Sequence, residues 1–161
     1  MVNRFHARNR SAATLAATQD QVWDILVDPD LLVRFTPNLK RIDVDGDRWT
    51  WHLTRLPVLS AAIEPSFTEV MELDKPERIF FRHDETRTEE RAGVDGEYVI
   101  RPVADGTEVT IDIGIWVDLP LPRLARPAVE RVMSTIVAGM GYRFGQQMRR
   151  HLRQVHPETK G

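Results

Sequence analysis

The longest amphipathic pattern in the chain runs from Arg126 to Val155. Apolar residues recur there every three or four positions, which places them on one face of an α-helix. Pro127 suits the first helical position, because its missing N–H would have no partner there. A helix of this length spans about 45 Å. The pattern therefore predicts a single helix over 126–155 that is long enough to cover a sheet.

Alternating apolar and polar positions precede this helix and predict an antiparallel sheet with one buried face. The clearest strand covers 107–117, where every second residue from Val109 onward is valine or isoleucine. Asp45–Gly46 and Asp105–Gly106 have the composition of tight turns between strands. The other predicted strands are 4–16, 39–44, 48–56, 63–73, 78–84 and 97–103.

Two short helices are predicted between the first two strands. Thr18 and Gln21 have the spacing of a capping box. Asp28 and Pro29 then end this helix and begin a second one, which stops before Pro37.

One internal segment and one terminal segment do not fit the strand and helix patterns. Residues 83–95 are highly charged and are expected to form a solvated hairpin or loop, with a mobile lid over a cavity mouth as the alternative. Residues 157–161 are expected to be a disordered tail. The remaining residues, 1–156, are expected to form a single domain.

Composition limits the classes of protein to consider. The chain has 161 residues, of which 42% are hydrophobic and 29% charged, as in a soluble domain with an independent core. No apolar run approaches the ~18 residues of a membrane span, and the first residues lack an apolar signal core. Cytoplasmic residence without integral membrane association is therefore expected. The absence of cysteine excludes disulfides, thiolate nucleophiles and cysteine-ligated metals.

Charge is unevenly distributed, although the net charge is only −2. Residues 123–156 are rich in arginine and contain one acid, Glu130. We interpret these arginines as a solvated helix face that pairs with acidic strands, so no nucleic-acid partner is expected. The arginines are Arg123, Arg126, Arg131, Arg143, Arg149, Arg150 and Arg153.

Several short passages resemble one superfamily. Residues 17–26, with Val22 and Trp23, resemble its "A-x-x-x-x-V-W-x-x-L" start of the first helix. Residues 69–79 resemble its "E-x-x-x-x-x-P-x-R-I" passage, and residues 96–109 its "G-x-V-x-F-x-P…G-T-x-V" strands. The chain is thus similar to the helix-grip superfamily of START domains, the major birch-pollen allergen and the polyketide cyclase/dehydrase group (SRPBCC).

The resemblance implies an α+β helix-grip fold. A curved antiparallel sheet of about seven strands would wrap around the long C-terminal helix, with two short helices after the first strand. Relatives hold lipids, sterols, polyketides or hormones in an apolar cavity between the sheet and the long helix. Fold alone does not establish an activity.

The apolar residues that alternation and helical spacing turn inward are candidates for lining such a cavity, and the alternative is that they fill a solid core. Gly139, Gly141 and Gly145 interrupt the long helix at about 1 kcal/mol each, which suggests room for a close-packed backbone or a bound molecule. The candidate ligand-binding residues are Trp49, Trp51, Phe67, Glu69, Met71, Phe81, Tyr98, Ile113, Met133, Val137, Met140 and Phe144. Leu53, Ile111, Ile115 and Ile136 are further inward positions.

Glu69 is the one acid that alternation places on an apolar face. A buried charge needs a partner, and Arg82 or Arg101 could provide it. The phase of the strand around Arg101 is open, because Tyr98 and Ile100 could be the inward pair instead. Glu69 is therefore a weak catalytic candidate, with a structural ion pair or a solvent-exposed rim position as the alternatives.

Other chemistry has little support in the sequence. The histidines do not have metal-binding spacing, and Ser60, Ser66 and Ser134 have no adjacent base. No nucleotide-binding, metalloprotease or nucleophile-elbow motif is present. We expect no metal and no cofactor.

Three functions remain open. The first is binding, transport or sequestration of a hydrophobic small molecule or lipid. The second is a metal-free polyketide-type aromatase or cyclase, in which Glu69 or a nearby histidine moves protons. The third is a protein-interaction module that uses the arginine face. The sequence leaves the ligand and the oligomeric state undetermined.

Overall fold

The computed structural model describes residues 1–156, and the predicted disordered tail lies outside this range. Its main element is a seven-stranded antiparallel sheet with the strand order β1-β9-β8-β7-β6-β3-β2. The first strand therefore pairs with the last one. The strands are β1 (Asn3–Leu15), β2 (Leu39–Asp45), β3 (Arg48–Leu53), β6 (Ser66–Asp74), β7 (Arg78–His83), β8 (Ala92–Val103) and β9 (Gly106–Leu119). A separate hairpin joins β4 (Leu56–Val58) to β5 (Ala61–Ile63).

The two predicted short helices are confirmed as α1 (Gln19–Leu26) and α2 (Pro29–Phe35). Thr18 caps α1 in the predicted capping box: its hydroxyl accepts from the Gln21 N–H at 3.1 Å, and the Gln21 side chain accepts from the Thr18 N–H at 2.8 Å. Asp28 caps α2 by accepting hydrogen bonds from the backbone N–H groups of Asp30 and Leu31.

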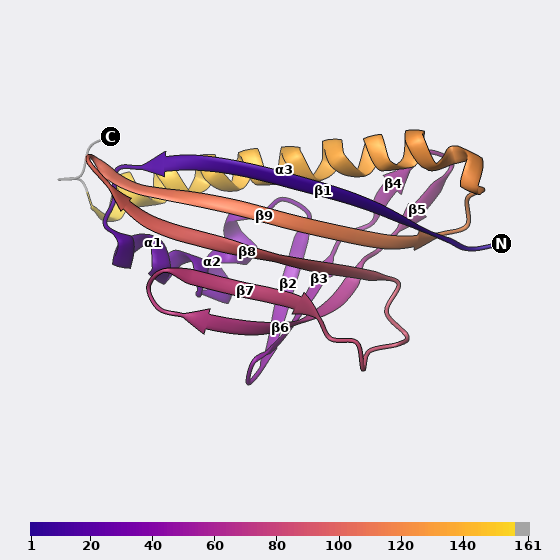
Figure 1. Cartoon of the computed structure of the whole chain (residues 1–161), viewed down its shortest axis with the longest axis horizontal. Helices are drawn as coiled ribbons and strands as arrows, with labels where there is room; N and C mark the ends of the chain where they lie inside the picture. The colour runs from indigo at the N-terminus through magenta and orange to yellow at the C-terminus, as the bar shows by residue number, and fades with distance from the viewer. Residues whose placement is uncertain (157–161) are drawn as a thin grey trace.

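The long C-terminal helix, α3 (Arg126–Val155), has the predicted bounds and follows a short 3₁₀ helix, η1 (Arg123–Ala125). It runs alongside β1 across the length of the molecule (Figure 1). Its buried residues are Val129, Met133, Phe144, Met148 and Leu152, all from the predicted apolar stripe. Within residues 1–156, no helix combines the length and the apolar character needed to cross a membrane.

Three strand predictions are wrong in their bounds. The predicted strand 63–73 begins only at Ser66, and Ile63 belongs to the β4–β5 hairpin instead. The predicted strand 48–56 ends at Leu53, and Leu56 instead begins the β4–β5 hairpin. Pro57 lies in that hairpin and has no N–H with which to extend a central ladder. The predicted strand 97–103 begins five residues earlier, at Ala92, because Ala92 to Val94 are buried against β9. The charged residues around this stretch concealed it in the sequence.

The glycines of α3 do not have the predicted packing role. A Cβ added at Gly139, Gly141 or Gly145 would meet no atom within 4 Å outside the local helix backbone. No neighbouring backbone therefore packs closely at these positions. Gly96 is different, because a Cβ there would collide with the Asp112 carbonyl oxygen and crowd the Phe81 ring.

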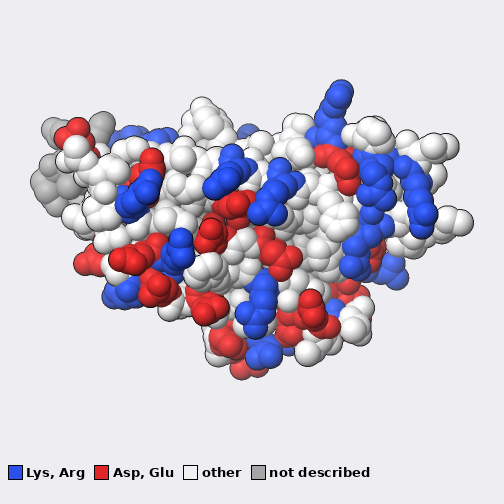
Figure 2. Space-filling model, in the orientation of Figure 1, with Lys and Arg blue, Asp and Glu red and all other residues white. Residues whose placement is uncertain are grey.

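The arginines of α3 do not bridge to acidic strands as predicted. Among the described residues, Arg126 pairs with Glu130 of the same helix at 3.3 Å, and Arg149 donates to the Thr14 carbonyl. Two acids of β9 pair instead with β1, through Arg4–Asp118 at 2.8 Å and Arg8–Asp112 at 3.0 Å. Cationic and anionic side chains are accordingly interspersed over the face shown in Figure 2.

Candidate ligand-binding cavity

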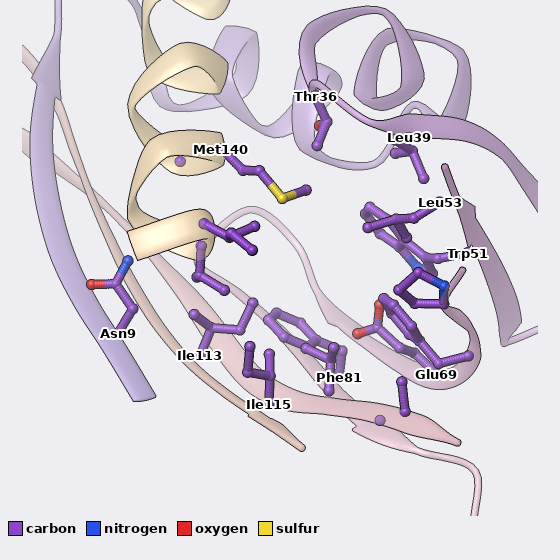
Figure 3. Close-up of a pocket in the computed structure, with 18 of the residues that line it drawn as sticks. Asn9, Thr36, Leu39, Trp51, Leu53, Glu69, Phe81, Ile113, Ile115 and Met140 are labelled. Carbon is purple, nitrogen blue, oxygen red and sulfur yellow. The ribbon is translucent and has the colours of Figure 1, made fainter. Parts of the chain in front are cut away.

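A cavity of about 220 Å³ lies between the sheet and α3. Met140 reaches into it from α3, while Phe81, Ile113 and Ile115 form part of the sheet side (Figure 3). The β4–β5 hairpin contributes further aliphatic side chains, including Val58. The lining is almost entirely apolar, as is typical of small-molecule pockets.

The residues predicted to face inward meet at this cavity, with one exception. Strand alternation brings one face of β3, β6, β7, β8 and β9 to it, and the three-and-four spacing of α3 supplies the facing side. The candidate residues that line the cavity are Trp51, Phe67, Glu69, Met71, Phe81, Tyr98, Ile113, Met133, Val137, Met140 and Phe144. Leu53, Ile111, Ile115 and Ile136 line it as well.

Trp49 is the exception, because it is buried in the core but does not border the cavity. It lies one alternation step beyond Trp51, toward the turn that joins β2 to β3. Alternation correctly predicted that Trp49 is on the buried face of β3. How far the cavity extends along β3 could not be predicted, because it depends on the tertiary structure.

The first strand supplies cavity residues that we did not predict. Asn9 and Ser11 line the cavity from β1. They share the phase of Phe5 and Leu15, which are both fully buried. That alternation was a usable signal, but the small polar residues between the two apolar ones obscured it.

Aromatic rings form two contacts at the sheet side of the cavity. Trp51 stacks on Phe67 of the neighbouring strand, with ring centroids 6.3 Å apart and planes inclined by 10°. Phe81 packs against Tyr98 at 5.5 Å in a tilted arrangement. These contacts give the cavity wall rigid, flat surfaces.

Glu69 is the only acidic or basic side chain from residues 1–156 that lines the cavity, and it is only 3% exposed. Burial, assisted by the Asp95 carboxylate, raises its pKa well above the usual value. The Trp51 indole N–H lies close enough to lower this pKa slightly, but the two groups lack the geometry of a regular hydrogen bond. Burial therefore dominates, and it favours the protonated form of the carboxyl group.

The predicted arginine partners of Glu69 are wrong. Arg82 and Arg101 are exposed, and Arg101 pairs with Glu108 on the solvent side. Tyr98 occupies the inward phase of β8 instead and lines the cavity. Burial and the neighbouring Glu69 raise the pKa of the Tyr98 hydroxyl, which therefore stays protonated.

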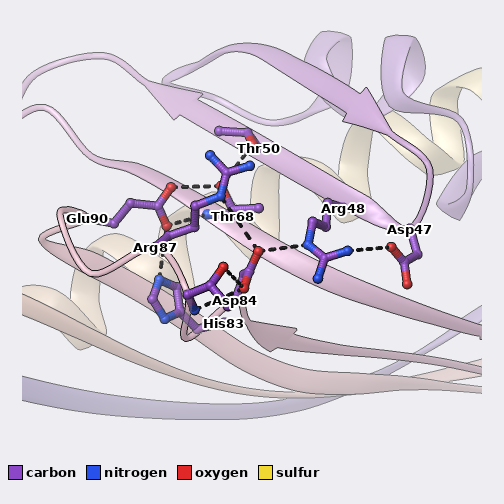
Figure 4. Close-up of polar contacts among 9 residues, drawn as sticks. Asp47, Arg48, Thr50, Thr68, His83, Asp84, Arg87 and Glu90 are labelled. Carbon is purple, nitrogen blue, oxygen red and sulfur yellow. Dashed lines mark hydrogen bonds and ion pairs between the residues drawn. The ribbon is translucent and has the colours of Figure 1, made fainter.

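The charged segment before β8 is held against the other face of the sheet. Glu90 accepts hydrogen bonds from the Thr68 N–H at 2.8 Å and the Thr68 hydroxyl at 2.7 Å, and it lies 3.0 Å from His83 (Figure 4). Asp84 accepts from Thr86 and pairs with the Arg48 guanidinium at 2.9 Å. The segment connects the antiparallel strands β7 and β8 as a hairpin with Glu85, Thr88 and Glu89 exposed, as predicted, but Asp84 and Glu90 hold it against the sheet.

The same contacts bear on the predicted lid. Asp84 and Glu90 fix the segment to β3 and β6, and the residues that follow, Ala92 to Val94, are part of the cavity wall itself. Residues 84–91 are therefore turns that are anchored to the sheet at both ends.

A second group of polar residues meets on this outer face although its members are distant in sequence. The His52 ring lies 2.8 Å from the Ser66 hydroxyl through Nδ1 and 2.9 Å from Asp43 through Nε2. These residues come from β3, β6 and β2, and the Asp43 side chain is 60% exposed. The contacts of His52 with Ser66 and Asp43 thus link three strands on the face of the sheet away from the cavity.

The curved antiparallel sheet, the long C-terminal helix and the apolar space between them define a helix-grip protein. The family model described as "Polyketide cyclase / dehydrase and lipid transport" matches residues 6–153. The chain belongs to this family. A search of curated proteins found none that matches the chain.

Solved structures show the same fold. A START superfamily protein from Mycobacterium smegmatis is 12% identical with a TM-score of 0.67, and the match covers 92% of this chain and 98% of that one. The Zhui aromatase/cyclase from Streptomyces sp. R1128 is 18% identical with a TM-score of 0.60, covering 92% and 96% of the two chains. At these identities the likeness concerns the fold and confirms the predicted helix-grip architecture.

Proposed function

We propose that the protein binds a hydrophobic small molecule or lipid in the cavity between the sheet and α3. The observation that carries this proposal is the apolar cavity itself, into which side chains from the sheet and from α3 converge. Membership in a family of cyclases and lipid carriers supports it. Burial of apolar ligand surface would supply the binding free energy, at roughly 25 cal/mol per Å².

Neighbouring positions on α3 provide a test with a matched control. Val137 lines the cavity, whereas the adjacent Ala138 is exposed and does not. In a titration with the neutral fluorescent probe N-phenyl-1-naphthylamine, Val137→Trp should weaken binding at least tenfold by filling the cavity. Ala138→Trp should bind like the wild type.

Two results would contradict the proposal. One is that no lipophilic probe binds the wild type and no molecule is released by solvent extraction of freshly purified protein. The other is equal probe binding by both tryptophan variants, which would place the probe outside the cavity.

A second candidate function is aromatase or cyclase activity on a bound aromatic or polyketide chain. The specific observation in its favour is the buried carboxyl group of Glu69 at the cavity wall, because burial raises its pKa and favours the protonated form that a general acid needs. Glu69→Gln should then abolish turnover of a bound polyketide substrate while leaving probe binding intact. Unchanged turnover would exclude Glu69 from the chemistry.

A further inference from the structure

Besides Asn9 and Ser11 of β1 and Thr36 after α2, polar side chains interrupt the apolar lining of the cavity on strands β3, β6 and β8. Trp51 comes from β3, Glu69 from β6 and Tyr98 from β8, and all three line the cavity. Trp51 and Glu69 lie next to each other, with Met140 of α3 on the other side of the space (Figure 3). The lining thus has a polar end at Trp51 and Glu69 and an apolar wall on α3, with Asn9, Ser11 and Thr36 as further polar positions.

The hydrogen bonds of this polar end are incomplete. Trp51 Nε1 is buried and makes no hydrogen bond of regular geometry to residues 1–156, although the Glu69 carboxyl group lies near it. An indole N–H can only donate, and buried donors in folded proteins nearly always have a partner. Because Trp51 borders the cavity, a ligand that presents an acceptor atom there would complete its hydrogen bonding.

The charges around the cavity limit what that acceptor can be. Within residues 1–156, no Lys, Arg or His lines the cavity, so an anionic ligand group would be buried without a counter-charge. Glu69 forms no ion pair with these residues, and its burial favours the protonated form, which donates a hydrogen bond. A neutral oxygen atom of a ligand can accept hydrogen bonds from both the Trp51 N–H and the protonated Glu69 carboxyl group. An ammonium group cannot accept a hydrogen bond from the Trp51 N–H, because both groups are donors.

We propose that Trp51, Glu69 and Tyr98 form a hydrogen-bonding subsite for a neutral carbonyl oxygen of the ligand. The apolar body of that ligand extends from the subsite toward α3. This inference rests on the proposed binding function and adds the chemical class and orientation of the ligand.

Two probes of nearly equal size separate the inference from the binding function. 2-Acetylnaphthalene carries a carbonyl group, and 2-ethylnaphthalene is the matching hydrocarbon. In competition with N-phenyl-1-naphthylamine on the wild-type chain, the hydrocarbon tests the cavity and the difference between the probes tests the subsite. The ketone should bind about tenfold more tightly than the hydrocarbon, the value of one well-placed hydrogen bond.

Variants assign this preference to the three residues. Trp51→Phe, Tyr98→Phe and Glu69→Leu each remove one donor and should reduce the preference for the ketone without weakening hydrocarbon binding. Glu69→Gln retains an N–H donor of the same size and should keep the preference. A purely structural role for Glu69 would not separate its Leu and Gln variants in this way.

A spectroscopic measurement provides a second readout that does not depend on affinity. Hydrogen bonding lowers the stretching frequency of a carbonyl group, so bound ¹³C-labelled 2-acetylnaphthalene should absorb at a lower wavenumber than in hexane. The shift should persist in Glu69→Gln and shrink in Glu69→Leu.

Three results would overturn the inference. Equal or tighter binding of the hydrocarbon would exclude the subsite but leave the binding function standing. Tighter binding of 1-(2-naphthyl)ethylamine or 2-naphthoic acid than of the ketone would assign the subsite to a charged group. If neither N-phenyl-1-naphthylamine nor any naphthalene probe binds the wild type, the binding function and the inference fall together.

Discussion

The two faces of the sheet bury carboxyl groups in opposite ways. Glu69, on the cavity face, and Asp84, on the outer face, are each only 3% exposed. Burial raises the pKa of Glu69 well above its usual value. The pKa of Asp84 instead falls to about 2, because Thr86 and Arg48 donate hydrogen bonds to its carboxylate.

The difference shows that partners, rather than burial, decide the state of these acids. The outer face satisfies its acids within the protein: Glu90 bridges Thr68 and His83, as Asp84 bridges Thr86 and Arg48. The cavity face leaves Glu69 without an ion pair among the described residues and the Trp51 N–H without a hydrogen bond of regular geometry. The hydrogen-bond network of the outer face has all its partners within the protein and stabilises the fold. On the cavity face, polar groups without a regular partner are available to hydrogen-bond a ligand.

The largest change in the free energy of unfolding is expected when a side chain of the outer-face hydrogen-bond network is removed. Glu90→Ala removes the acceptor of two Thr68 donors, and Thr68 is fully buried. The Thr68 hydroxyl can still donate to the Thr50 hydroxyl at 2.9 Å, but leaving the Thr68 N–H unpaired should lower the free energy of unfolding by about 2 kcal/mol. Glu89→Ala, at an exposed position of the same segment, should change it by less than about 0.5 kcal/mol. Denaturant titration measures both, and similar losses in the two variants would mean that Glu90 does not anchor the segment.

The two buried acids should also give opposite pH dependences. Between the unfolded pKa of Glu69, near 4.5, and its raised folded value, only the folded state retains the proton. Stability therefore declines as pH rises through this interval, by up to about 1.4 kcal/mol per pH unit, and Glu69→Gln should remove that decline. Stability measured by denaturant titration from pH 4 to 8 would reveal it, and parallel profiles for the wild type and the variant would contradict the raised pKa.

Asp84 supplies the control at the acidic end of the same profile. Its folded pKa lies below the unfolded value of 3.8, so its contribution is complete above that value and is lost as pH falls toward 2. Asp84→Asn should flatten the profile between about pH 4 and 2 and leave the decline caused by Glu69 unchanged.

Much of this fold could be predicted because its signals are local. The capping box at Thr18, the α3 stripe and the alternation of β9 each specify one element from its own residues. Alternation also assigned Phe67, Glu69 and Met71 to the cavity face. These predictions depended on periodicity alone, and the tertiary structure did not override it.

The failures concern contacts between distant residues. Nothing near Glu90 in the sequence identifies Thr68 as its partner, so a charged segment that is pinned to the sheet resembled a solvated loop. The same holds for Ser66 and His52, which meet only because β3 and β6 pair in one register. The incomplete hydrogen bonding of Trp51 is also invisible until the neighbouring strands are in place.

The smallest effect concerns the helix side of the cavity face. Gly139 is exposed in the middle of α3, and an added Cβ there would meet no atom outside the local helix backbone. Gly139→Ala should therefore raise the free energy of unfolding by up to about 1 kcal/mol, since alanine loses less conformational freedom on folding. Probe binding should stay at the wild-type level, because Gly139 does not line the cavity. Gly141 does line it, so Gly141→Leu should weaken binding while Gly139→Leu does not. Thermal or denaturant unfolding together with probe titration measures both effects, and a loss of binding in Gly139→Ala would show that the cavity depends on flexibility of α3 rather than on the space beside it.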